Sequence, residues 1–283
     1  MDQWQIETVV IDDGSDQSPK EALEREGLLE KIHLELSNHQ GPSKARNLGI
    51  QLAHGRFILF LGDDIIARPE LVAAHMRMLT GQPERKIISL GHAQWNAPGI
   101  SPPLYEHSQA HRFGDMNGGE ETHYRHFYTS NIALAKTAFN EVGVFDTSFT
   151  GASWGWEDTE LGYRLNQKGW KLVYNREAWG EHIHPPMSIR QMLERQVRIG
   201  VGGCRFYAKH PNEEVAELAF MPGTREMKLG PQWRRELGIA AATALEKLAP
   251  NSRMLEEIYR RLVFSCRVQG VQHGRKLFPE AGI

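Results

Sequence analysis

Cysteine is scarce in this chain of 283 residues, and long apolar runs and a strong net charge are absent. The two cysteines, Cys204 and Cys266, match no metal-ligand or redox spacing, which excludes a disulfide scaffold and predicts free thiols. No apolar run approaches the roughly 18 residues that a membrane span needs, and the first residues do not resemble a signal peptide. With 40% apolar and 24% charged residues the composition is that of a globular protein, which we expect to be cytoplasmic.

The net charge of -2 is divided unevenly along the chain. Residues 1–189 carry 17 basic and 25 acidic side chains, a net charge of -8, whereas residues 190–283 carry 16 and 10, a net charge of +6. We therefore predict a domain boundary at this point. The acidic first domain argues against a nucleic-acid partner and fits carboxylates gathered around a cation. The basic residues of the second part either form a solvated helical surface or make a peripheral contact. The partner in that contact would be an acidic molecule or an anionic membrane.

Short apolar runs alternate with helical patterns along the first domain. The runs at residues 8–11 and 57–61 predict buried strands, and helical spacing follows each of them. Further strands are predicted over residues 32–36, 87–90, 130–134 and 171–174, and helices over residues 19–31, 43–54, 69–79, 136–142 and 157–168. This alternation predicts an α/β fold, a mostly parallel sheet flanked by helices.

The remainder of the chain follows two other patterns. Residues 93–128 are rich in Gly, Pro, His and aromatic residues without a sustained period, and we expect loops that cover the site. From residue 189 onward, apolar residues recur at helical spacing. This pattern predicts a helical C-terminal extension, with helices near residues 213–221, 231–248 and 252–268.

Two predicted strands end in acidic turns. Asp63 and Asp64 follow residues 57–61, and Asp12 and Asp13 follow the first strand. Ligands of open α/β sheets bind beyond the carboxyl ends of strands, and paired carboxylates repel each other unless a cation lies beside them. Asp63 and Asp64 therefore suggest Mg²⁺ or Mn²⁺ on a diphosphate, and Asp12 and Asp13 suggest hydrogen bonds to a ribose or base. The alternatives are a solvated turn that caps the next helix and an ordinary Asp-Gly turn.

Two later segments combine aromatic, acidic and imidazole side chains. Trp154 and Trp156 offer flat faces for sugar rings, and the adjacent Glu157 and Asp158 could supply a general base beside a binding carboxylate. The alternative is buried aromatic residues followed by favourable acidic residues in the first turn of a helix.

Histidines and basic residues complete the set of candidates. His182 and His184 lie on one side of an extended segment, where they are either metal ligands or structural residues. Lys44 and Arg46 stand at the start of a predicted helix, where a phosphate group is favoured.

In this order, the motifs resemble the inverting family 2 glycosyltransferases of the GT-A fold. Residues 10–15 resemble the nucleotide-binding strand end of that family, and residues 41–49 its Ala-Arg-Asn-x-Gly element. Residues 57–64 resemble the strand that leads into the Asp-x-Asp signature. Residues 154–158 are similar to the Trp-Gly-x-Glu-Asp motif, which galactosyltransferase-like C-terminal segments share.

The resemblance implies transfer of a sugar from a nucleotide-diphosphate sugar to a hydroxyl of a glycan, lipid-linked or small-molecule acceptor. It makes Asp158 the base that deprotonates the acceptor. It also makes Asp64 and His182 the ligands of Mn²⁺ or Mg²⁺, with His184 as the alternative histidine. The implied donor-binding residues are Asp12, Asp13, Lys44, Arg46 and Asp63, and the implied acceptor-positioning residues are Trp154, Trp156 and Glu157.

Two departures from the family pattern keep other functions open. Gly62 stands where the signature usually has its first aspartate, and the strand and helix with which the family opens are expected to be missing before residue 9. One alternative is therefore a truncated, non-catalytic relative that binds a glycan or a partner enzyme. The other is a nucleotidyltransferase, although the glycine-rich basic loop that would bind a triphosphate is not found near residue 1.

Overall fold

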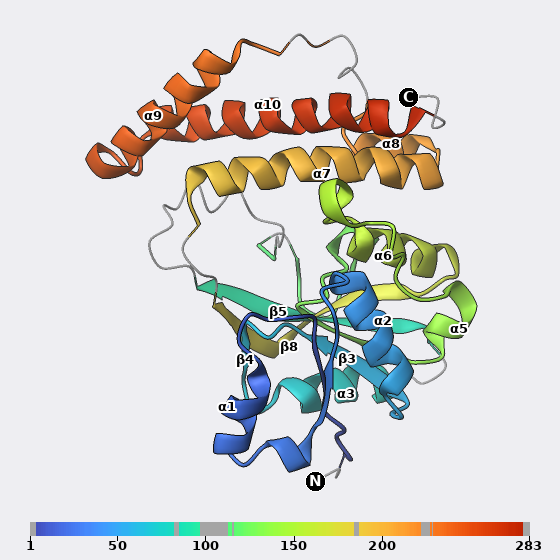
Figure 1. The fold of residues 1–283 in the computed structure, drawn as a ribbon. Coiled ribbons are helices and arrows are strands. Elements are labelled where there is room, and N and C mark those ends of the chain that lie inside the picture. The colour runs from blue at the N-terminus through green and yellow to red at the C-terminus, as the bar shows by residue number, and fades with distance from the viewer. Residues whose placement is uncertain are drawn as a thin grey trace. The chain divides into compact units, whose positions relative to one another are not determined.

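The fold is described from a computed structural model of residues 4–81, 85–96, 113–114, 116–183, 187–221, 227 and 229–279. The chain divides into two compact units, and each is described by itself (Figure 1). The first consists of Met1–Gln94, Asp115–Thr147 and Glu157–Glu181, and the second of Trp95–Gly114, Ser148–Trp156 and His182–Ile283. The last segment of the second unit begins at His182, eight residues before residue 190, where the charge pattern places the start of the second domain. The two other segments of this unit come earlier in the chain.

A six-stranded sheet forms the centre of an α/β fold, as the sequence predicts. Its order is β3-β7-β5-β8-β4, and β6 pairs with β8 (Figure 1). The strands are β3 (Phe57–Leu61), β4 (Ile65–Ala67), β5 (Ile87–Asn96), β6 (Glu121–Thr122), β7 (Asn131–Ala135) and β8 (Lys171–Ile183). We expected mostly parallel strands, but β7 lies between β3 and β5 and runs antiparallel to both, and β6 runs antiparallel to β8.

A second, smaller sheet pairs the first two strands in parallel. In this sheet β1 (Val9–Asp12) lies beside β2 (His33–Leu36), and neither pairs with another strand of the described residues. Between them the chain forms α1 (Pro19–Arg25) and the short 3-10 helix η1 (Leu29–Lys31). The sequence predicts that the strand with which the family fold opens is missing before β1, and this stays a prediction.

The helices of the first unit begin close to their predicted positions, with two corrections at their starts. They are α2 (Pro42–Leu52), α3 (Leu71–Gly81), η2 (Tyr124–His126), α5 (Ala138–Val142) and α6 (Glu157–Gln167). Gly41, at a φ of 92°, is the N-cap of α2, whereas Ser43, with which this helix was predicted to begin, is buried in the first helical turn. Pro69 precedes α3, which begins at Leu71.

A buried polar network joins α3 to the sheet. The imidazole of His75 lies 2.8 Å from Oγ of Ser89 through Nδ1 and 2.9 Å from Oδ1 of Asn131 through Nε2. The amide of Asn131 donates to the carbonyl of Ala178 at 2.9 Å, and that of Asn175 donates to Oγ of Ser89 at 3.1 Å. Burial lowers the pKa of His75 to about 4, so the ring is neutral in the folded protein at pH 7.

Helices make up most of the described second unit. They are η3 (Gly151–Ser153), α7 (Ile189–Lys209), α8 (Glu213–Leu218), α9 (Gln232–Leu248) and α10 (Arg253–Leu277), which continues nine residues beyond its predicted end. Glycines set the distance between α7 and α10. A Cβ added at Gly200 would lie 2.4 Å from the carbonyl oxygen of Arg267, and one added at Gly270 would lie 2.1 Å from that of Val197. Larger residues at these two positions would force the helices apart.

The inner side of α9 completes the core of the second unit. Ile239 and Ala242 of α9 pack with Leu255, Tyr259 and Leu262 of α10 in one buried cluster. None of the helices in the described part of the chain combines the length and apolarity needed to cross a membrane.

Replacement of His75 by glutamine tests the buried network. The folded-state pKa of His75, about 4, lies below its ordinary value of 6.5, so between these pH values the unfolded chain binds a proton that the folded protein does not. The stability that the neutral imidazole contributes is therefore complete above pH 6.5 and is lost as the pH falls toward 4. We expect the free energy of unfolding to fall between pH 7 and 4 by about 3 kcal/mol more in the unsubstituted protein than in His75→Gln. Urea denaturation at both pH values measures this difference, and equal losses in the two proteins would contradict it.

Candidate functional site

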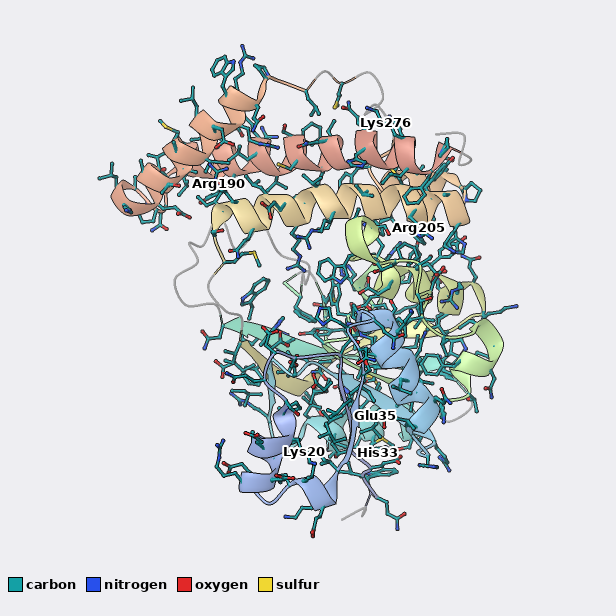
Figure 2. The ribbon with its side chains drawn as sticks, in the orientation of Figure 1. Lys20, His33, Glu35, Arg190, Arg205 and Lys276 are labelled. Carbon is teal, nitrogen blue, oxygen red and sulfur yellow. The ribbon has the colours of Figure 1, made fainter. Side chains whose placement is uncertain are left out.

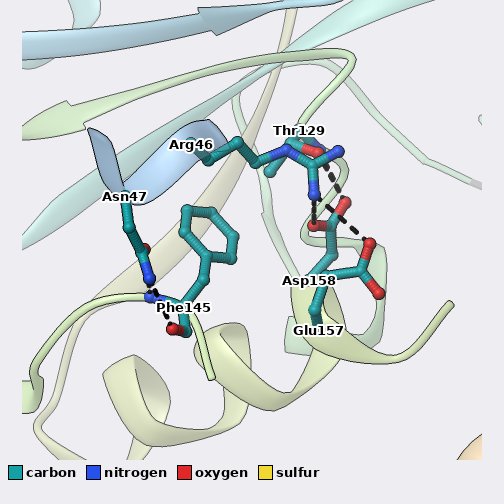
Figure 3. A network of polar contacts seen from close by, with 6 residues as sticks. All are labelled: Arg46, Asn47, Thr129, Phe145, Glu157 and Asp158. Carbon is teal, nitrogen blue, oxygen red and sulfur yellow. Dashed lines mark hydrogen bonds and ion pairs between the residues drawn. The ribbon is translucent and has the colours of Figure 1, made fainter. Parts of the chain in front are cut away.

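A single guanidinium binds the acidic pair at the start of α6. Glu157 and Asp158 are the first two residues of this helix. From α2, Nη1 of Arg46 lies 3.2 Å from Oε1 of Glu157 and 3.2 Å from Oδ1 of Asp158 (Figure 3). The side chain of Glu157 is 5% exposed and that of Asp158 24%, so the first ion pair is nearly shielded from water and the second remains accessible. Two motifs more than a hundred residues apart therefore form one site.

Thr129 binds the other oxygen of Asp158. Its backbone N–H donates to Oδ2 at 3.0 Å and its hydroxyl donates at 2.7 Å (Figure 3). Thr129 is buried just before β7, at the end of the region for which the sequence shows no period. No motif in the sequence marks Thr129, whose only signal is its place beside a predicted strand. With Arg46 on one oxygen and Thr129 on the other, the carboxylate of Asp158 is fixed in orientation.

The position of Arg46 is set by contacts of α2. The neighbouring Asn47 donates from its side-chain amide to the carbonyl of Phe145 at 2.8 Å and accepts from the N–H of Phe145 at 2.9 Å (Figure 3). The guanidinium carbon of Arg46 also lies 5.5 Å from the centre of the Phe145 ring. These contacts hold the start of α2 against the loop that follows α5.

Asp13 joins the end of β1 to the loop before α2. Its Oδ1 accepts hydrogen bonds from Oγ of Ser37 and the N–H of Gln40, both at 2.8 Å, and its Oδ2 accepts from the N–H of Gly41 at 2.7 Å. Burial raises the pKa of Asp13, but these three donors outweigh it and the net pKa is lowered. The bonds assign Asp13 a structural role, and its predicted contact with a nucleotide stays a prediction.

Asp12 and Lys44 lie on either side of the contact between Asp13 and the loop before α2. Oδ1 of Asp12 accepts from the hydroxyl and the N–H of Ser15, at 2.6 and 3.0 Å, and these bonds lower the pKa of Asp12. Lys44 is exposed on α2 and lines a pocket of about 460 Å³ together with Asn47 and Thr147. The structure thus brings the predicted acidic turn and the predicted basic helix start into one region of the first unit.

Asp63 and Asp64 form the turn between β3 and β4. The next element is a strand, so the alternative in which this turn caps a helix is wrong. A Cβ added at Gly62 would lie 2.6 Å from Oδ1 of Asp64. Glycine at this position therefore lets the carboxylate of Asp64 fold back against the main chain, where the aspartate of the family signature would displace it.

The predicted metal ligands are distributed over both units. Asp64 belongs to the first unit, His182 is buried in the second at the end of β8, and His184 lies outside the described residues. Within the described ranges, no three His, Cys, Asp or Glu side chains gather closely enough to form a metal site. A carboxylate and an imidazole are nevertheless donors that suit Mn²⁺, so the chemistry of the predicted set fits the ion.

The two tryptophans of the acceptor motif have different surroundings in the second unit. Trp156 is buried, stacks on Phe206 at a centroid distance of 5.4 Å, and donates from Nε1 to the carbonyl of Ile199 at 2.8 Å. Trp154 is partly exposed, with the guanidinium of Arg195 5.6 Å from its ring centre. Burial favours the packing alternative for Trp156 and leaves Trp154 as the aromatic candidate for contact with an acceptor.

Comparison with known proteins identifies the family. Residues 3–143 match the family described as "Glycosyl transferase family 2". The chain is 30% identical over 235 residues to validoxylamine A glucosyltransferase of Streptomyces hygroscopicus subsp. jinggangensis (strain 5008), an alignment that covers 73% of this chain and 54% of that protein. The chain therefore spans about half the length of this relative.

Two solved structures share the fold of the chain at low sequence identity. Residues 1–349 of S. aureus TarS in complex with UDP align with a TM-score of 0.50 and 17% identity, covering 95% of this chain and 82% of that one. The mannosyltransferase PcManGT from Pyrobaculum calidifontis, in complex with GDP-Man and Mn²⁺, aligns with a TM-score of 0.53 and 14% identity, covering 96% and 78%. These likenesses confirm the predicted GT-A fold. The sequence match places residues 3–143 in glycosyltransferase family 2.

Proposed function

We propose that this protein transfers a sugar from a nucleotide-diphosphate sugar to an acceptor hydroxyl, with Asp158 as the general base. The observation that carries the proposal is the carboxylate of Asp158, held by Arg46 on one oxygen and by Thr129 on the other. A carboxylate fixed in this way is an oriented proton acceptor that remains partly open to solvent. Family membership supports sugar transfer as the reaction that such a base would serve.

The proposed reaction is a direct displacement. Asp158 takes the proton of the acceptor hydroxyl while the acceptor oxygen attacks the anomeric carbon, and the bond from that carbon to the diphosphate breaks. Attack from the side opposite the leaving group inverts the anomeric centre. Glu157 stays paired with Arg46 throughout, which keeps the guanidinium against Asp158.

The donor is proposed to bind beside the end of β1 and the start of α2. Asp12, Lys44, Arg46 and Asp63 would contact the nucleotide sugar, and Asp13 would hold the loop that carries these contacts. TarS with UDP and PcManGT with GDP-Man and Mn²⁺ support a donor of this class. Asp64, with His182 or His184, would hold Mn²⁺ or Mg²⁺, and such an ion when bound neutralises charge on a departing diphosphate.

The acceptor is proposed to be a glycan, a lipid-linked sugar or a small molecule, with Trp154 as an aromatic contact. We also propose a cytoplasmic location. The net positive charge of residues 190–283 would favour a peripheral contact with the anionic inner face of a membrane.

Asp158→Asn separates transfer from donor binding. The variant keeps the shape of the side chain but removes a basic oxygen, so we expect donor turnover to fall by about a hundred-fold or more. Calorimetric titration with UDP, GDP and dTDP, each with and without Mn²⁺, should show one nucleotide bound equally well by both proteins. An unchanged rate would remove Asp158 from the base role. Failure of every nucleotide to bind the unsubstituted protein would favour the non-catalytic relative instead.

Thr129→Val tests the orientation of the base. Valine keeps the size of the side chain and the backbone N–H but removes the 2.7 Å hydrogen bond to Oδ2 of Asp158. We expect kcat to fall by about ten-fold with little change in the KM for the donor, since the substitution disturbs the position of the base. Thr129→Ser, which restores the hydroxyl, should recover the rate. Equal losses in the valine and serine variants would assign Thr129 a packing role only.

His182→Ala and His184→Ala identify the histidine that serves the metal. Loss of the ligand should weaken nucleotide binding in the presence of Mn²⁺ and leave metal-free binding unchanged. Calorimetry of both variants measures this difference. We expect the effect in His182→Ala, and an effect confined to His184→Ala would reverse the assignment.

A further inference from the structure

The outer side of α9 carries an apolar stripe that is open to solvent. Trp233 is 56% exposed, Leu237 60% and Leu248 82%, and the alanines between them are also exposed. At 100° per residue, the six side chains fall within an arc of about 100° that contains no polar residue. These residues, which we call the α9 stripe, are Trp233, Leu237, Ala240, Ala241, Ala244 and Leu248.

The orientation of α9 is fixed by contacts on its other sides. Ile239 and Ala242 are buried in the core of the second unit. Arg235 donates to Oε1 of Gln269 at 2.8 Å, and Tyr259 donates to the carboxylate of Glu246. Because these contacts hold α9 against its neighbour α10, rotation of the helix cannot bury the stripe. A helix that is apolar on opposite sides is normally covered on both.

Basic side chains border the stripe. Arg234 and Lys247 are exposed and flank it near its two ends. Over α9 and α10 together, six basic side chains are exposed, and two of them, Arg260 and Arg261, pair with Glu257. The acidic residues of the two helices are Glu256, which is exposed, and Glu236, Glu246 and Glu257, which are half-buried. The exposed basic residues are Arg234, Lys247, Arg253, Arg260, Arg261 and Lys276, the last of which is labelled on α10 in Figure 2.

The size of the stripe argues against a second copy of the chain as its partner. The stripe spans 16 residues and is about 22 Å long, and three of its six side chains are alanines. A stripe in which half of the side chains are alanines offers little of the ~800 Å² that each partner of a stable interface usually buries. A lipid surface needs no such area, because apolar side chains enter the headgroup region one by one and basic neighbours add electrostatic attraction.

We propose that the α9 stripe docks the protein on an anionic lipid surface. Leu237, Leu248 and the alanines enter the boundary between headgroups and acyl chains, Trp233 lies at headgroup level, and Arg234 and Lys247 pair with lipid phosphates. This inference deepens the proposed peripheral membrane contact by naming its surface, and it stands apart from the proposed transfer reaction.

Co-sedimentation with vesicles tests the proposal. The probes are vesicles of phosphatidylcholine with about 30% phosphatidylglycerol and vesicles of phosphatidylcholine alone, at about 0.1 M NaCl. We expect binding to the anionic vesicles, a loss of affinity of about ten-fold or more in Leu237→Ser/Leu248→Ser, and a comparable loss in Arg234→Gln/Lys247→Gln. Ile66→Ser is the matched control, because Ile66 is 61% exposed but lies on β4, and it should bind as the unsubstituted protein does.

Several results would overturn the proposal. The first is that the unsubstituted protein does not bind anionic vesicles, and the second is that it binds both kinds of vesicle equally. The third is that the Ile66→Ser control loses as much vesicle affinity as the substitutions in the stripe do. Analytical ultracentrifugation without lipid identifies the competing occupant: a dimer that Leu237→Ser/Leu248→Ser dissociates, with vesicle binding unchanged, would assign the stripe to self-association. Asp158→Asn should bind vesicles normally, so a failure of the transfer reaction and a failure of membrane docking are distinguishable.

Discussion

The pair of contacts made by Arg46 is the interaction on which the rest of the candidate site depends. Glu157 and Asp158 are adjacent at one helix end, where two carboxylates repel each other unless a cation lies between them. Glu157 is nearly buried, so loss of its ion pair with Arg46 would remove a compensating charge from a carboxylate that is shielded from water, which is unfavourable. Arg46 itself depends on α2, which Asn47 fixes at Phe145 and Asp13 fixes at Gly41. Any anion that attracts Arg46 therefore acts on both acids as well.

Local pattern predicts the elements of this fold better than their pairing. The continuous apolar run at residues 57–61 matches β3 at both ends, since an uninterrupted run of this kind has few other conformations open to it. The direction of β7 could not be predicted, because a short strand with four apolar residues in a row carries no mark of which neighbours it will join. The lengths of β5 and β8 were underestimated because their outer parts carry exposed polar side chains, such as Gln94 in β5 and Arg176 in β8, so each apolar run ends before its strand does.

The candidate site was predictable to the extent that its residues stand in short motifs. Arg46, Glu157 and Asp158 were found in this way, and the structure brings them together. Thr129 was not, because its role depends on a contact with a helix 29 residues further along the chain and on a backbone N–H that any residue offers. Burial of Trp156 was one of the two alternatives that the sequence left open, because an aromatic residue beside glycine can lie in a core or at a sugar site.

The separate pairing of β1 affects the order in which parts of the first unit unfold locally. Among the described strands β1 bonds only to β2, so one side of its backbone lacks a strand partner. Strands held on one side exchange their amide hydrogens through local openings that cost less than global unfolding. The turn that carries Asp12 and Asp13 lies at the end of this strand. A ligand bound there would thus clamp a strand that has one strand neighbour, and ligand affinity would include the free energy of closing it.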